Sequence, residues 1–216
     1  MNNTYAREPI NGFTHLAGAI LSFIGLLALV IKTTLYNPSI ISITSVIIFG
    51  TSLILLYSAS ATYHLVIASD KVIAFLRKID HSMIFILIAG SYAPFCLIGL
   101  KEYNGWILFS VVVTIAICGV LFKMIWFNCP RWISTFIYVG MGWISVIMIV
   151  PLYKSIPFAG LFLLILGGIL YTIGAIIYGL KPSALKFKSL GFHEIFHIFI
   201  ILGSLSHFFA VYRYII

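Results

Sequence analysis

The sequence predicts an all-α fold, a polytopic membrane protein with seven transmembrane helices. Of the 216 residues, 62% are hydrophobic and only 8% are charged, whereas soluble chains carry about 25% charged residues. Apolar runs of about 20 residues, the length that crosses a bilayer, recur along the whole chain. A single soluble core cannot bury so much apolar surface, so a soluble domain is excluded.

The apolar runs and the polar breaks between them define seven spans in a single domain, residues 1–216. The first run is followed by Lys32 and lacks the pattern of a cleaved signal peptide, so we expect a retained helix. The breaks are Tyr36-Asn-Pro38, Ser69-Asp-Lys71, Lys101-Glu-Tyr-Asn104, Asn128-Cys-Pro-Arg131, Lys154 to Pro157, and Lys181-Pro182. With ends good to about 2–4 residues, the spans lie at about 13–33, 40–66, 80–100, 105–127, 132–152, 158–180 and 192–214.

The basic residues predict the orientation of the helices. Seven spans leave the two termini on opposite sides, and the cationic side chains divide unequally between those sides. One side carries Lys32, Lys101, Lys154 and Arg213; the other carries Arg7, Lys71, Arg77, Lys78, Lys123, Arg131, Lys181, Lys186 and Lys188. The positive-inside rule places the N-terminus in the cytoplasm and the C-terminus outside. Because the cations are scattered singly, nucleic acid is not an expected partner.

Histidines and acids gather near the predicted cytoplasmic face. His64 lies at the end of the second span, with Ser60 one turn deeper on the same helix face. Asp80 opens the third span, and His193 and His197 are stacked one turn apart at the start of the seventh. An acidic side chain in the middle of a span costs about 2.5–3.5 kcal/mol, so such residues usually have a partner or a function.

Three imidazoles from two helices predict a metal site. His64, His193 and His197 can bind an ion of tetrahedral preference and leave one position for water, which is the pattern of a catalytic zinc site. Imidazole also suits iron, copper and nickel, so the spacing alone does not select Zn²⁺. The alternative is a hydrogen-bonded network that joins the helices.

Two acids are candidates for the group that works on the water. His193-Glu-Ile-Phe-His197 matches the HExxH motif, in which Glu194 would be the general base. The position of Glu194 near Lys186 and Lys188 also permits a simple charge role at the helix N-terminus. Asp80 at the start of the neighbouring helix could instead hold the water, and we favour Asp80. His15 and His81 lie at the same level without an assigned role. His207 is ten residues beyond His197, about 15 Å along the helix, so it is left out of the metal site.

These residues together resemble the hemolysin III family, the bacterial branch of the progestin and adipoQ receptor superfamily. The resemblance is carried by Glu8-Pro-Ile-Asn11, Thr14-His15, Ser60-Ala-Thr-Tyr-His64, Asp80-His81 and His193-x-x-x-His197, and it covers essentially the whole chain. It implies zinc bound by His64, His193 and His197, a water held by Asp80, and Ser60 close by. It also implies a ceramidase-like hydrolysis of lipid amides, with a membrane lipid as substrate, or a role in regulating membrane lipids. A member of the bacterial branch is expected in the bacterial inner membrane.

Three functions remain open at this point. The leading one is zinc-dependent hydrolysis of a lipid amide or ester, with Asp80, Ser60 or Glu194 as catalytic groups. The second is membrane permeabilisation, as the hemolysin name suggests. The third is an intramembrane metalloprotease of the HExxH type.

Overall fold

The structure is a computed structural model that describes residues 6–182, 185 and 190–216. Lys186 and Lys188, two of the cations used to predict the orientation, lie outside the described residues. The elements are α1 (Pro9–Tyr36), α2 (Ile40–Leu65), α3 (Asp70–Pro94), the π-helix η1 (Phe95–Gly99), the 3-10 helix η2 (Lys101–Tyr103), α4 (Gly105–Ile125), α5 (Arg131–Trp143), the 3-10 helix η3 (Ile144–Met148), α6 (Ile149–Ser155), α7 (Phe158–Leu180) and α8 (Phe192–Tyr214).

These elements combine into seven long apolar helices among the described residues, as the sequence predicted. The third continues from α3 into η1, and the fifth joins α5, η3 and α6, so that each of the seven is long and apolar enough to cross a membrane. The all-helical, seven-span prediction is therefore confirmed at this level. The orientation and the single-domain organisation stay predictions.

The predicted start of the third helix was wrong by ten residues. The prediction began at residue 80, but α3 begins at Asp70. Asp70, Lys71, Arg77 and Lys78 make this first part too polar to count as an apolar run. They do not prevent helix formation, since the backbone hydrogen bonds of a helix do not depend on hydropathy.

The fifth span, predicted as one run over 132–152, is broken in its middle. The hydroxyl of Tyr92 in α3 donates to the carbonyls of Met141 and Gly142 and accepts from the backbone N–H of Ser145. A side chain from another helix thus takes over backbone groups where α5 gives way to η3. Pro151 in α6 also lacks the N–H that a regular helix uses.

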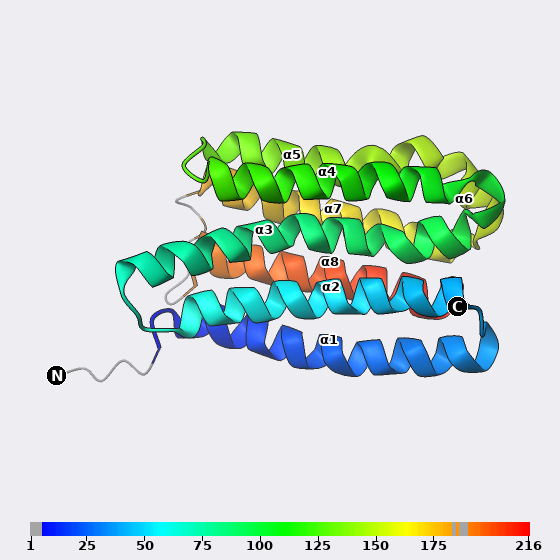
Figure 1. Ribbon diagram of the computed structural model, residues 1–216, viewed down its shortest axis with the longest axis horizontal. Coiled ribbons are helices and arrows are strands. Elements are labelled where there is room, and N and C mark those ends of the chain that lie inside the picture. The colour runs from blue at the N-terminus through cyan, green and yellow to red at the C-terminus, as the bar shows by residue number, and fades with distance from the viewer. Residues whose placement is uncertain (1–5, 183–184, 186–189) are drawn as a thin grey trace.

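The helices follow one another around a ring (Figure 1). Each long helix packs on the next in the chain, and α8 returns to contact both α7 and α1. The connections α2–α3, α4–α5 and α7–α8 lie at the end where α1 begins, which we call the histidine end. The connections α1–α2, α3–α4 and α6–α7 lie at the opposite end, together with the C-terminus.

The outer face of the ring is apolar and the inner face carries the polar groups. Large apolar side chains such as Phe13, Ile24 and Ile125 are exposed, whereas Ser45, Ser52 and many other serines are buried. In water so large an exposed apolar surface would be unfavourable, and in hydrocarbon it is the expected exterior. Functional polar groups are therefore expected inside the ring.

Close backbone contact joins α4 to the π-helix. A Cβ placed on Gly105 would lie 2.1 Å from the carbonyl oxygen of Cys96 and 2.7 Å from Cβ of Leu100. Because a backbone carbonyl is the obstacle, the contact cannot be relieved by a rotamer change. A glycine is thus required where α4 begins.

The substitution Gly105→Ala is expected to destabilise the protein by about 1–3 kcal/mol, the cost of overpacking. Gly140→Ala is the matched control, because a Cβ on Gly140 meets nothing within 4 Å and alanine favours a helix. Thermal unfolding in detergent measures both variants. Equal midpoints for the two would contradict the close contact.

Candidate metal centre

The three histidines predicted as metal ligands come together at the histidine end. His64 lies in the last turn of α2, and His193 and His197 occupy the first two turns of α8. One ring nitrogen from each lies within 4.8 Å of the other two, and the Nε2 atoms of His64 and His193 are 3.3 Å apart. The group could hold a metal ion.

The chemistry of these side chains fits a transition metal. His64 and His197 are 1% and 2% exposed, and Nδ1 of His197 is buried without a hydrogen-bond partner among the described residues. A buried polar atom left unpaired costs about 1–3 kcal/mol. An ion bound by imidazole nitrogens would account for such a cluster, although this donor set does not choose among zinc, iron, copper and nickel.

A carboxylate that the sequence analysis left without a role orients His64. The Glu8 carboxylate lies 2.6 Å from Nδ1 of His64, and Nε2 of the same ring faces His193. Burial raises the pKa of the Glu8 carboxyl, but the hydrogen bond and charge of His64 and the charge of Arg7 lower the pKa below its ordinary value. Metal-binding histidines typically donate their second N–H to a carboxylate in this way. The only signal in the sequence was an acid at the level of the histidines.

Glu194 has a different environment from the one that the HExxH motif predicts. Its Oε2 accepts the backbone N–H of Gly191 at 2.7 Å, which caps the start of α8. Its Oε1 accepts from Nδ2 of Asn11 in α1 at 2.8 Å. Both oxygens are therefore engaged, Oε2 in capping α8 and Oε1 in joining α8 to α1.

Asp80 and Ser60 lie on the wall of a cavity inside the ring, and His193 and His197 line the same cavity. The Asp80 carboxylate faces the Ser60 hydroxyl. Asp80 is not among the three residues whose donor atoms converge. The structure thus places Asp80 on the wall of the cavity that two of the candidate ligands also line.

The other histidines have separate surroundings. The ring of His15 stacks on that of His197 with centroids 3.6 Å apart, and neither of its nitrogens has a hydrogen-bond partner among the described residues. His81 is 2.8 Å from the Tyr178 hydroxyl through Nε2 and 2.8 Å from the Arg77 carbonyl through Nδ1. His207 lies apart from the metal-ligand group, as expected.

The sequence profile of the family described as Haemolysin-III related matches residues 3–208. The chain belongs to this family. The haemolysin-III-related chain is 41% identical over 212 residues to Hemolysin-3 homolog from Bacillus subtilis (strain 168), covering 98% of this chain and 95% of that protein. It is 38% identical over 218 residues to Hemolysin-3 from Bacillus cereus, covering 100% and 95%.

A more distant relative agrees with the resemblance to adiponectin receptors. The haemolysin-III-related chain is 28% identical over 225 residues to Adiponectin receptor protein from Drosophila melanogaster. The alignment covers 94% of this chain and 50% of that protein. The predicted family membership is confirmed, together with the distant similarity to the receptors.

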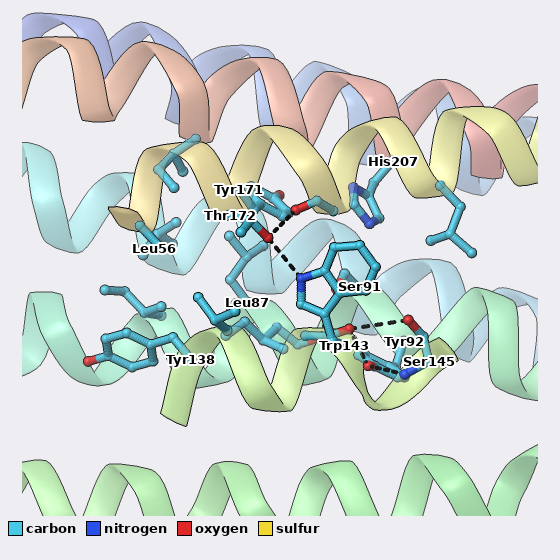
Figure 2. A pocket seen from close by; sticks show the side chains of 18 of the residues that line it. Leu56, Leu87, Ser91, Tyr92, Tyr138, Trp143, Ser145, Tyr171, Thr172 and His207 are labelled. Carbon is cyan, nitrogen blue, oxygen red and sulfur yellow. Dashed lines mark hydrogen bonds between the residues drawn. The ribbon is translucent and has the colours of Figure 1, made fainter. Parts of the chain in front are cut away.

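The cavity continues from the histidines deep into the haemolysin-III-related ring. It measures about 170 Å³ for the centre of a water-sized sphere, and most of its wall is apolar. Figure 2 shows its middle part, where Trp143 of α5 donates its indole N–H to Thr172 of α7 and the ring of His207 points toward the same space. Leu87 and Tyr138 contribute to the wall nearby.

The substitution His197→Gln is expected to abolish retention of a stoichiometric metal ion, because it removes one of three converging ring nitrogens. His207→Gln, on the same helix and also buried, is expected to keep the metal. Elemental analysis of detergent-purified protein measures both. Retention by both variants would contradict the assignment of the ligands.

Removal of the Glu8 carboxylate is expected to weaken metal binding without abolishing it. Glu8→Gln should lower the affinity about 10–100-fold, the usual effect of losing the carboxylate behind a metal-binding histidine. Competition with a chelator of known affinity measures the change. Glu102→Gln, an exposed acid paired with Lys101, is the control, and equal affinities of the two variants would refute the role of Glu8.

Proposed function

We propose that this protein is a metal-dependent hydrolase that cleaves the amide or ester bond of a membrane lipid. One observation carries the proposal: two of the three converging imidazoles, those of His193 and His197, line one end of a long apolar cavity. At that end the wall also carries Asp80 and Ser60. A metal-ligand group, a carboxylate and an apolar binding space thus meet at one place.

The cavity suits a substrate with a long acyl chain. It is lined at different depths by His193 and His207 of α8, which are 14 residues apart and hence about 21 Å apart along the helix axis. Leucine and isoleucine side chains such as Leu56, Leu87 and Ile200 form much of the wall. They bind an acyl chain and exclude water from everything except the reacting end.

The histidines and the residues around them have different chemical roles. A zinc-type ion, when bound by His64, His193 and His197, supplies Lewis-acid chemistry that activates water and polarises a carbonyl. Asp80 accepts the proton of the attacking water at a carboxylate oxygen. It returns that proton to the leaving nitrogen or oxygen as the carbon–nitrogen or carbon–oxygen bond breaks. Ser60 holds the Asp80 carboxylate in place.

The unequal distribution of cations supports a cytoplasmic position for the histidine end. In that orientation the reacting end of the cavity lies at the inner leaflet. The substrate is then a lipid of that leaflet, and the acyl chain points toward the membrane centre.

Two other functions are distinguished by experiment. Membrane permeabilisation is suggested only by the name hemolysin that the Bacillus relatives carry. Equal leakage of liposomes caused by the wild type and by His64→Ala would favour it. Intramembrane proteolysis with Glu194 as base receives less support, because both oxygens of Glu194 already accept hydrogen bonds.

The carboxylates separate the hydrolase from the protease. Asp80→Asn is expected to lower kcat for a long-chain lipid amide or ester by at least about 10²-fold, the contribution of a general base, while the metal content stays unchanged. Glu194→Gln should keep kcat and lower thermal stability. Loss of turnover in Glu194→Gln alone would favour the protease, and full turnover after thorough chelation would overturn the proposed function.

A further inference from the structure

A second cavity lies at the histidine end, and none of the candidate metal ligands lines it. It measures about 200 Å³ for the centre of a water-sized sphere, and it lies between α3, α4, α5, α7 and the α4–α5 connection. The described residues that line it are Arg77, His81, Lys123, Phe127, Asn128, Cys129, Arg131, Ser134 and Tyr178. We call it the basic pocket.

Three of these nine residues are cationic and none is acidic. Arg77, Lys123 and Arg131 take part in none of the ion pairs within 4 Å between described residues. The whole sequence contains only five acids. Asp80 lines the other cavity, where the charge of Arg77 acts on it without a direct ion pair. The basic pocket therefore concentrates positive charge that the chain does not neutralise by direct pairing.

Lys123 is a buried cation without an anionic partner among the described residues. Its residue is 3% exposed, and its ammonium donates to Oγ of Ser134 at 2.5 Å and weakly to Sγ of Cys129 at 3.5 Å. An ammonium has three donors, and neither hydroxyl nor thiol brings a negative charge. Because a buried charge is costly unless it is paired, an anion in the pocket would stabilise this lysine.

Aromatic rings hold the cations around the space. The Arg77 guanidinium lies 5.2 Å from the centre of the Phe127 ring, and Lys123 Nζ lies 5.5 Å from the centre of the same ring. Both cations thus make cation–π contacts with Phe127. The Arg131 guanidinium lies 5.7 Å from the centre of the Tyr178 ring. Arg131 is also the first residue of α5, where the helix dipole disfavours a cation.

We propose that the basic pocket binds a phosphate group, supplied either by a lipid headgroup or by free phosphate. Arginine matches phosphate oxygens with paired N–H donors, and a lysine adds a point charge. Basic pockets between transmembrane helices at the level of the headgroups are the usual places for anionic lipids. The pocket shares only His81 and Tyr178 with the larger cavity, so this proposal does not depend on hydrolysis.

Calorimetric titration of the purified full-length protein tests the proposal. The probes are inorganic phosphate and, in separate titrations, short-chain phosphatidylglycerol. Arg131→Gln and Arg77→Gln are expected to weaken binding of the preferred probe at least about tenfold, the effect of losing one charged hydrogen bond. Lys71→Gln is the matched control: it removes a cation from the exposed start of α3, outside the pocket, and should change the affinity less than about twofold.

The two probes distinguish the possible sources of the phosphate group. Tighter binding of phosphatidylglycerol than of phosphate identifies a lipid headgroup, and the reverse order identifies free phosphate. Cys129→Ser should keep binding, because the serine hydroxyl preserves a polar partner for Lys123. Size-exclusion chromatography establishes that each variant is folded. Absence of binding to both probes, or an equal loss in Lys71→Gln, would overturn the proposal.

Discussion

The pairing of two carboxylates with groups on other helices holds the candidate metal centre together. Glu8 contacts His64 at the end of α2, while Glu194 at the start of α8 accepts from Asn11 in α1. These contacts join three helix ends that come from distant parts of the chain. Hydrogen bonds in the low-dielectric interior of a protein are stronger than in water, so these contacts can hold the three helix ends together. The convergence of the imidazoles depends on the positions of those helix ends.

The rest of the ring follows from the difference between its two surfaces. The outside is covered by apolar side chains that lipid solvates as well as the protein interior would, so hydrophobic burial contributes little to helix association. Close contact and internal hydrogen bonds take over that role. Gly105 against the Cys96 carbonyl is one such contact, and the Tyr57 hydroxyl bound to Ser204 at 2.6 Å is another.

The two cavities at the histidine end have opposite chemical characters. The larger one is mostly apolar and reaches the candidate ligands, whereas the basic pocket gathers three cations. The hydrogen bond between His81 and Tyr178 lies in the wall that they share. The proposed acyl chain and the proposed phosphate group would therefore occupy separate cavities.

The sequence by itself determined the seven apolar helices, the family and the three converging histidines. Apolar runs of span length need no tertiary information, and His193 and His197 share a helix face by periodicity alone. It misplaced the start of α3 and missed the break after α5, because hydropathy does not report where a helix begins outside the membrane or which backbone groups Tyr92 engages. The roles of Glu8 and Glu194 required the tertiary structure. Glu194 satisfied a local motif, yet one of its oxygens was engaged by Asn11, 183 residues earlier in the chain, and Glu8 acquired its partner 56 residues later. Contacts between residues so far apart in the sequence leave no periodic pattern, so only the packing of α1, α2 and α8 decided them.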